Sequence, residues 1–354
     1  MKLMEEDVRR VAAAAREAGE DLFCITGAMP GAATLAAVFC DEKELSLLAL
    51  PGRFVPLNTP GAQALTARFD PGDRFGFPAY RLGEGLLAAD VRLLGDASFR
   101  AFCAAKRVRH ILVPFAELAD PAEYGGRRDY GWIGEFRAEL PFDIRVTALF
   151  SEPLPDYGPF LVRFASPGCT VLDASVPPSL YAYETANGRK RIGYTLYLAE
   201  KRALRRVAVL FTNRREAEEF LWFLRARGQS GLYLNGAMTA AEQQAALEAF
   251  RRGEGILAAT KSVLPYAPFA RADAVIYCGV PYSSSFIARC ASFSAEGELE
   301  CCFCPRDFAT DVNILKYFAG NLPEEEREPY LEQGLSRLLQ VKNMIRGTEE
   351  EADQ

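Results

Sequence analysis

Hydrophobic and polar positions follow two regular patterns along the chain. In the first half, short apolar stretches alternate with segments of helical period, and bounded stretches of this kind are typical of buried strands. Parallel neighbours in a sheet need crossover connections, which place helices over the sheet. The pattern therefore predicts a parallel α/β sheet whose strands are Leu22–Ile25, Leu45–Leu50, Val91–Leu94, Ile111–Val113 and Val146–Leu149.

The pattern restarts in the second half with the apolar stretch VAVLF (Val207–Phe211). Helices are predicted over 214–225 and 239–252. Thr239 and Glu242 form a capping box, which satisfies free amides at the start of the second helix. Further strands are predicted at Gly231–Leu234, Ile256–Ala259, Ala274–Tyr277 and Leu299–Phe303. These elements predict a second parallel sheet.

The segments between and after the two sheets predict the domain organisation. Glu152–Pro178 is rich in Pro and Gly and has no sustained amphipathic period, so we expect a connector there. After Pro305 the pattern is helical to about Arg346, and the acidic tail GTEEEADQ is expected to be disordered. The chain is therefore expected to hold three parts: a first lobe over 1–175, a second lobe over 176–304, and a helical extension over 305–354.

Composition limits the partners of the chain. The sequence has 354 residues, which exceeds the usual size of one domain. Its 41 Lys and Arg residues against 47 Asp and Glu residues give a net charge of -6, so it lacks the positive field of many nucleic-acid binders. Any binding of nucleic acid must use local basic patches, whose alternative interpretation is a solvated face. No run of about 18 apolar residues and no signal peptide occurs, so we expect a cytoplasmic protein without membrane contact.

Cysteine and histidine give no recognisable site. The nine cysteines are odd in number and scattered, which argues against a disulfide framework. Cys301, Cys302 and Cys304 suggest a metal site, but adjacent strand residues point to opposite faces and four convergent ligands are needed. The single histidine, His110, is interpreted as an ordinary residue at a strand start. We therefore expect no metal and no cofactor.

Three stretches of sequence carry a resemblance to a known family. The most specific is Arg206–Pro281, which includes LFTNRREAEEFLWFLRARG and ADAVIYCGVP. The other two are RRDYGWIGEFRAELPF (Arg127–Phe142) and VPPSLYAY (Val176–Tyr183). In order and spacing these stretches resemble the RecQ-type DNA helicases of superfamily two, in which the second stretch would follow the Asp-Glu motif and the third would connect the lobes. The resemblance implies two RecA-like lobes in tandem.

The phosphate-binding loop of that family has lost its ligands here. Such a loop needs glycines whose backbone amides cradle phosphate, a Lys that reaches the β and γ phosphates, and a Ser or Thr for magnesium. The matching stretch is TGAMPGAAT, in which Gly27 and Gly31 keep the glycines. Ala32 falls on the Lys position and Ala33 on the hydroxyl position. Thr34 supplies a hydroxyl if the register slips by one residue.

The family's magnesium-binding Asp-Glu pair is also replaced. The resemblance places Pro114 and Phe115 on the two acidic positions, and neither side chain can hold magnesium or activate water. Glu117 takes the place of the final His in the DEAH-type pattern. The family's Thr-Ala-Thr coupling motif reads FSE at 150–152. The first lobe therefore lacks the residues that hydrolysis needs.

The arginine-finger motif of the second lobe is degenerate as well. It reads RCASFSAEGE, and Phe293 and Glu296 fall near the two arginine positions. An arginine finger alone contributes about 10³ to 10⁵ in rate. Losses within one working unit do not simply add. Several together indicate that hydrolysis is not what this chain does.

Aromatic residues are candidates for base stacking or for the core. Tyr130, Trp132 and Phe136 lie in a segment that, in the family, couples DNA contact to ATP turnover. The spacing of four between Trp132 and Phe136 on a predicted helix favours the core. Trp222 and Phe223 are predicted to pack inside the second lobe.

The resemblance implies a function without catalysis. We expect an inactive RecQ-like helicase core that binds single-stranded DNA or another nucleic acid, or that scaffolds an assembly through a protein partner. The candidate nucleic-acid contacts follow two strands on one sheet edge: Thr212, Asn213, Arg214, Thr260 and Lys261. Two alternatives stay open. One is an ATP-dependent DNA helicase with divergent motifs, and the other is a pseudoenzyme that binds only protein.

Overall fold

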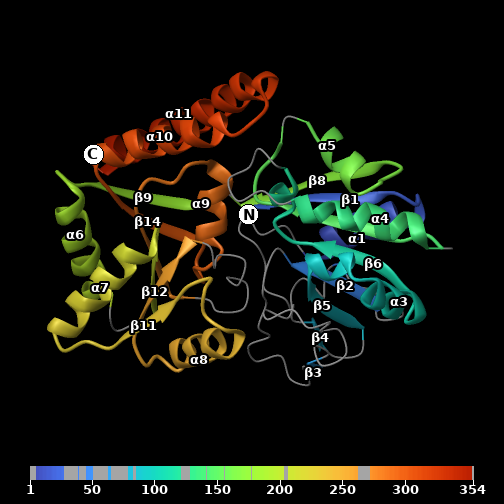
Figure 1. Ribbon diagram of the computed structural model, residues 1–354, viewed down its shortest axis with the longest axis horizontal. Coiled ribbons are helices and arrows are strands. Elements are labelled where there is room, and N and C mark those ends of the chain that lie inside the picture. Colours follow the sequence, from blue (N-terminus) through green and yellow to red (C-terminus); the bar gives the residue numbers. More distant parts are fainter. Residues whose placement is uncertain are drawn as a thin grey trace. The chain divides into compact units, whose positions relative to one another are not determined.

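The computed structural model divides the chain into two compact units, Met1–Pro177 and Pro178–Gln354. Each unit is built around one sheet (Figure 1), which confirms the expected α/β class with two sheets in tandem. The expected boundaries at 175 and 304 stay predictions. The structure describes residues 5–27, 39, 45–50, 63–64, 79–82, 85–120, 128–140, 142–154, 156–176, 178–202, 206–261 and 272–352.

Unit 1 holds an eight-stranded sheet in the order β3-β4-β5-β2-β6-β7-β1-β8. The strands are β1 (Asp21–Gly27), β2 (Leu45–Leu50), β3 (Gln63–Ala64), β4 (Ala79–Leu82), β5 (Leu86–Asp90), β6 (Val108–Val113), β7 (Arg145–Phe150) and β8 (Cys169–Val176). Strand β4 pairs antiparallel with β3 and β5, and the other pairs are parallel. The helices are α1 (Glu5–Glu17), α3 (Ala97–Ala105), α4 (Trp132–Glu139) and α5 (Gly158–Arg163), with 3-10 turns η2 (Val91–Gly95), η3 (Ala116–Ala119) and η4 (Arg128–Gly131).

Two predictions for unit 1 are wrong. The expected strand Val91–Leu94 is the 3-10 turn η2, because the Asp90 carboxylate accepts a hydrogen bond from the Arg92 amide at 3.0 Å and starts the turn after β5. The expected connector over 152–178 contains α5 and β8. Strand β8 pairs with β1 but is half exposed, so it lacks the continuous apolar run of an inner strand.

Unit 2 holds a six-stranded parallel sheet in the order β11-β12-β10-β13-β14-β9. The strands are β9 (Ser179–Glu184), β10 (Val207–Phe211), β11 (Gly231–Leu234), β12 (Ile256–Thr260), β13 (Ala274–Cys278) and β14 (Glu298–Phe303). The helices are α6 (Gly188–Lys201), α7 (Arg214–Ala226), α8 (Ala240–Arg251), α9 (Ser284–Ala291), α10 (Pro305–Gly320) and α11 (Glu324–Ala352). Helix α11 includes the acidic tail up to Ala352, so the expected disorder there is wrong.

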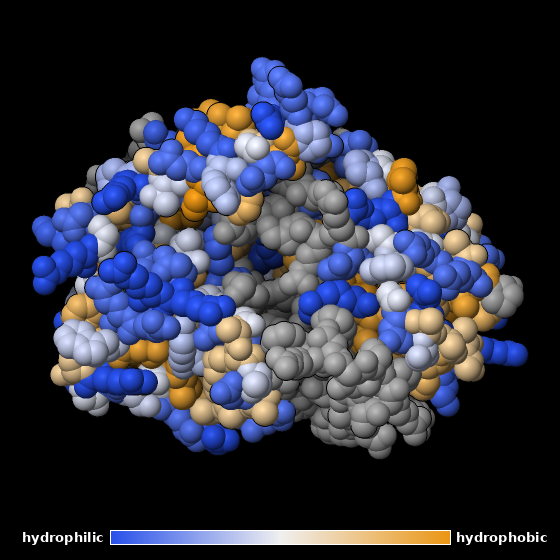
Figure 2. Space-filling model, viewed as in Figure 1, coloured by the Kyte–Doolittle hydropathy of each residue, from blue (hydrophilic) through white to orange (hydrophobic). Residues whose placement is uncertain are grey.

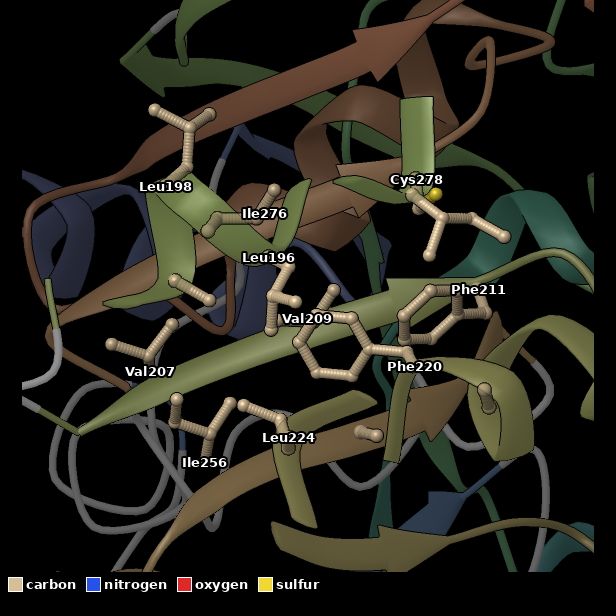
Figure 3. Close-up of a cluster of buried hydrophobic side chains, with 14 of the residues drawn as sticks. Leu196, Leu198, Val207, Val209, Phe211, Phe220, Leu224, Ile256, Ile276 and Cys278 are labelled. Carbon is tan, nitrogen blue, oxygen red and sulfur yellow. The ribbon is translucent and has the colours of Figure 1, made fainter. Parts of the chain in front are cut away.

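Strand β10 and helix α7 form the centre of the unit 2 core. Figure 3 shows Val209 and Phe211 of β10 beside Phe220 and Leu224 of α7, and all four are buried. The Phe211 and Phe220 ring centroids lie 5.2 Å apart. Trp222 was expected in this core, but 63% of it is exposed because the buried positions of α7 lie on its other face.

A local signal in unit 2 was predicted correctly. The capping box at the start of α8 is present, with the Thr239 amide donating to the Glu242 carboxylate at 2.7 Å. The described residues on one face of the molecule are mostly hydrophilic (Figure 2). Among the described residues, no helix is both long and apolar enough to cross a membrane.

Candidate functional site

The carboxyl edge of the unit 1 sheet is closed where β6 ends. Pro114 follows the last residue of the strand, and Phe115 has a left-handed backbone with φ of 55° and a fully buried side chain. A non-glycine residue in that conformation is strained and persists only when its surroundings hold it. Here the buried ring holds it. Neither side chain offers an oxygen to a cation.

Glu117 is the carboxylate that remains beside this strand end. Its side chain is 2% exposed. The Ser151 hydroxyl donates to its Oε1 at 2.6 Å, and the Ser151 amide donates to its Oε2 at 3.4 Å. Strands β6 and β7 are parallel neighbours, and the Glu117–Ser151 pair joins the segments that follow them. Both carboxylate oxygens of Glu117 therefore accept hydrogen bonds inside the protein.

Of the phosphate-loop candidates, the structure describes only the first, Gly27. Gly27 is the last residue of β1 and pairs with Val176 of β8. Gly31, Ala32, Ala33 and Thr34 lie outside the described residues. The replacement of the Lys and the hydroxyl residue by Ala32 and Ala33 is therefore known from the sequence alone.

The two arginine-finger positions of unit 2 are placed in different environments. Phe293 lies just after α9 and is fully buried, and its carbonyl accepts a hydrogen bond from the Ala272 amide at 2.7 Å. Glu296 is exposed. Neither residue carries a positive charge. Arg289 lies on α9 and is 3% exposed, and it donates to the Tyr282 hydroxyl at 3.0 Å.

Three of the nucleic-acid candidates follow β10 at the carboxyl edge of the unit 2 sheet. The Thr212 hydroxyl lies 3.2 Å from the Tyr277 hydroxyl. Asn213 caps α7 by accepting a hydrogen bond from the Glu216 amide at 3.0 Å. Arg214 is exposed at the first turn of α7. Of the three, Arg214 presents a charged group to solvent.

The other two candidates end the neighbouring strand β12. Thr260 is 5% exposed. Lys261 is half-buried, and its Nζ lies 5.4 Å from the centre of the Tyr282 ring. Burial lowers the pKa of Lys261 to about 8, although Asp311 counteracts this through its charge. The structure thus places the five candidates on one sheet edge, with Arg214 the most exposed of the charged ones.

A pocket of about 270 Å³ opens at the same edge of unit 2, where β10, β13 and β14 end. Thr212 and Asn213 line it, together with a buried charge network centred on Arg191. Arg191 of α6 pairs with Glu216 of α7 at 2.5 Å and with Asp307 of α10. Sequence reasoning missed this network, because Arg191 belongs to the basic run 189–191, which was interpreted as a local basic patch or a solvated face.

Asp311 adds a titratable group to the pocket. It lies on α10, one turn after Asp307, and lines the same cavity. Burial raises the pKa of the Asp311 carboxyl to about 7, and the positive charge of Lys261 counteracts part of that rise. Burial also raises the pKa of Glu216. The pocket therefore changes its charge near neutral pH.

The remaining residues that sequence analysis singled out are structural. Tyr130 and Phe136 are fully buried, which confirms the core prediction for Phe136, and Trp132 is half-buried. His110 is buried and lies 3.1 Å from the Ser46 hydroxyl. In the described part of the chain, no three His, Cys, Asp or Glu residues are grouped so as to hold a metal ion.

Comparison with known proteins gives the fold. No protein-family model and no curated protein sequence matches the chain. The DEAD-box helicase Mss116 bound to ssRNA is 14% identical with a TM-score of 0.62, over 92% of this chain and 77% of that one. The Mycobacterium smegmatis helicase Lhr bound to ssDNA is 13% identical with a TM-score of 0.60, over 92% of this chain and 48% of that one.

The DUF1998 helicase MrfA bound to DNA is a third neighbour. It is 11% identical with a TM-score of 0.59, over 84% of this chain and 48% of that one. The chain thus spans about half the length of MrfA and of Lhr. These likenesses show that the chain has two RecA-like lobes, as superfamily-two helicases do. The closer resemblance to the RecQ type stays a prediction.

Proposed function

We propose that this chain is a catalytically inactive, RecQ-like helicase core that binds nucleic acid or scaffolds an assembly. The observation that carries the proposal is the closed strand end in unit 1. The side chains of Pro114 and Phe115 offer no oxygen ligand, and both carboxylate oxygens of the buried Glu117 accept hydrogen bonds from Ser151. Magnesium in a phosphoryl-transfer site needs a free carboxylate. The described residues of this edge therefore do not fit a magnesium nucleotide.

The arginine-finger positions of unit 2 support the same conclusion. A finger cation stabilises the charge of the transferring phosphoryl group. The positions that resemble the finger motif hold a buried Phe293 and an exposed Glu296. A buried ring gives no charge, and an exposed carboxylate repels phosphate. ATP is therefore expected to bind no tighter than about millimolar and not to be hydrolysed.

Nucleic-acid binding is supported by the carboxyl edge of unit 2. Contacts that hold a strand without reading its sequence go mainly to phosphates, from basic side chains, hydroxyls and helix amino ends. Arg214 is exposed at the amino end of α7, beside Thr212. Mss116, Lhr and MrfA are neighbours whose structures contain RNA or DNA. Binding through this edge should be weak, independent of sequence and steeply dependent on salt.

The test is one set of titrations on the full chain with labelled ATP, single-stranded DNA and duplex DNA. We expect no phosphate release and a salt-dependent affinity for the single strand. The double variant R214A/K261A should lower both the affinity and the salt slope. DNA-stimulated phosphate release that disappears when residues 27–34 are changed would overturn the inactive-core proposal and favour an active helicase with divergent motifs. Absence of DNA binding at low salt would favour a scaffold that binds only protein.

A further inference from the structure

A cluster of four tyrosines lies at the β9 edge of unit 2. It consists of Tyr181 and Tyr183 on β9 with Tyr194 and Tyr197 on α6, and we call it the tyrosine surface. The Tyr183 and Tyr194 ring centroids lie 5.5 Å apart, and those of Tyr194 and Tyr197 lie 5.7 Å apart. Tyr181 is 46% exposed and Tyr197 is 51% exposed. Tyr183, Tyr194 and Tyr197 therefore form a row of rings that reaches solvent, and Tyr181 is exposed on the same strand as Tyr183.

The position of β9 explains why these rings stay uncovered. β9 is the edge strand of the sheet, and Tyr181 and Tyr183 share one of its faces while Leu180 is buried on the other. Helix α6 packs over β14 and β13, which lie one and two strands further in from β9, respectively. Tyr183 and Tyr194 are partly buried and pack against the core of unit 2. The two inner rings therefore anchor the row, and the two outer rings are presented to solvent.

Positive charge flanks the tyrosine surface on α6. Arg189, Lys190 and Lys201 are exposed, and within the described ranges none of the three has an ion-pair partner. Lys190 and Lys201 lie four residues from Tyr194 and from Tyr197, respectively, so the four share one helix face. Cations therefore stand at both ends of the row of rings.

Two of the acidic residues beside the surface are paired. Glu200 pairs with Arg227 at 2.5 Å, and Glu300 pairs with Arg202 at 3.0 Å. Glu184, the last residue of β9, is exposed beside the surface. Arg189, Lys190 and Lys201 outweigh this one carboxylate, so the local charge is positive although the whole chain carries -6.

We propose that the tyrosine surface, with Lys190 and Lys201, is a second binding surface for single-stranded DNA. Exposed rings stack on unpaired bases, and flanking cations neutralise phosphates, without sequence readout. Lys190 and Lys201 are separated by about 16 Å along α6, which suits a few nucleotides. Duplex DNA should bind more weakly, because its base faces are already stacked and only its phosphates can contact the lysines. The inference shares its ligand class with the proposed function but uses the edge of the sheet opposite β11.

The experiment measures binding of the full chain to a labelled oligothymidine and to a duplex of equal length. The variant Y181A/Y197A should lose affinity for the oligothymidine by on the order of tenfold or more, because each ring stacks on one base. Y181F/Y197F keeps the rings and should bind like wild type. Y317A is the matched control, since Tyr317 is 71% exposed on α10 and lies outside the tyrosine surface. K190A/K201A should lower the salt slope by about 1.4.

The possible results separate this inference from the proposed function. If Y181A/Y197A binds like wild type while R214A/K261A loses affinity, the tyrosine surface is overturned and the carboxyl edge stands. If both variants lose affinity while Y317A does not, both surfaces are supported. An equal loss in Y317A or in the phenylalanine variant overturns stacking at this surface. Light scattering that shows a dimer dissociated by Y181A/Y197A would make the surface a protein interface and also overturn the inference. Both replaced rings are largely exposed, so melting temperature serves as the folding control.

Discussion

The described part of each unit contains a buried charge network, and these two networks lie at opposite ends of their sheets. In unit 1, Asp21 at the start of β1 is 1% exposed and binds Arg137 at 2.6 Å and the Val146 amide at 2.7 Å. In unit 2, Arg191 binds Glu216 and Asp307 where the strands end. Ligands of open α/β sheets bind outside the carboxyl ends of the strands. The first network is therefore structural, and the second lies where a ligand would bind.

The described strand ends of the two units also differ. In unit 1, the ends of β6 and β7 hold the buried Glu117–Ser151 pair and the buried Phe115. In unit 2, a pocket opens where β10, β13 and β14 end, and Arg214 is exposed after β10. The described strand ends of unit 2 are therefore the ones that we propose bind nucleic acid.

Replacing Asp21 gives the sharpest test of a purely structural network in unit 1. D21A removes the carboxylate that Arg137 and the Val146 amide share, leaving a buried charge without its partner. We expect the free energy of unfolding to fall by about 3 to 5 kcal/mol, measured by chemical denaturation. R252A, in an exposed pair with Glu254, is the control and should cause no measurable change. A D21A protein as stable as wild type would remove the distinction between the two networks.

Replacing Glu117 tests the closed edge. E117A leaves the Ser151 hydroxyl and amide without this acceptor in a buried site, so we expect a loss of about 1 to 3 kcal/mol in the free energy of unfolding. S151A removes only the hydroxyl bond and keeps the backbone amide, so in a double-mutant cycle with E117A it isolates the side-chain contact. DNA affinity should not change. If E117A left stability intact but altered nucleotide binding, the carboxylate would be functional and the edge would not be closed.

Most inner strands of both sheets were predictable because they are buried on both faces and form continuous apolar runs. The inner strand β5 is an exception, since the sequence analysis placed a strand at Val91–Leu94, directly after it. Phe211 and its neighbours on β10 are an example. The failures lie at sheet edges and turns. β8 and β9 are half exposed and alternate in burial, so they did not stand out from loops. Val91–Leu94 is as apolar as a strand, and the cap from Asp90 turns it into a 3-10 helix.

The candidate site was predictable where it depends on strand ends and not where it depends on distant contacts. The edge with Thr212 and Lys261 follows from parallel strand order alone. The partners of Arg191 lie 25 and 116 residues later in the chain, at Glu216 and Asp307. The basic run 189–191 gives, from its own sequence, no sign of such distant partners. The Glu117–Ser151 pair, 34 residues apart, was missed for the same reason, although both residues follow neighbouring strands.

Removing the charge of Asp311 tests whether this buried carboxylate in the unit 2 pocket destabilises the folded protein at high pH. Unfolded Asp311 loses its proton near its ordinary pKa of 3.8, whereas the folded group holds it to about 7. Between these values the folded state binds more protons, so the contribution of Asp311 to stability falls as pH rises. The variant D311N has no carboxyl group at this position, so it should not lose this stability as the pH rises. Its melting temperature should exceed that of wild type at pH 8 and match it at pH 4. The exposed variant E325Q should show no such difference.

The smallest expected effect concerns the exposed cation that distinguishes the open edge. R214A removes one solvent-exposed charge without touching the core. It should weaken single-stranded DNA binding roughly two- to fivefold, as expected for one exposed charge contact, and lower the salt slope by about 0.7. R251A is the matched control, since Arg251 is exposed at the end of α8, before β12 begins at the amino edge of the sheet. Fluorescence anisotropy at several salt concentrations measures both quantities. Equal slopes for R214A and R251A would mean that charge alone, and not its place at the strand ends, governs binding.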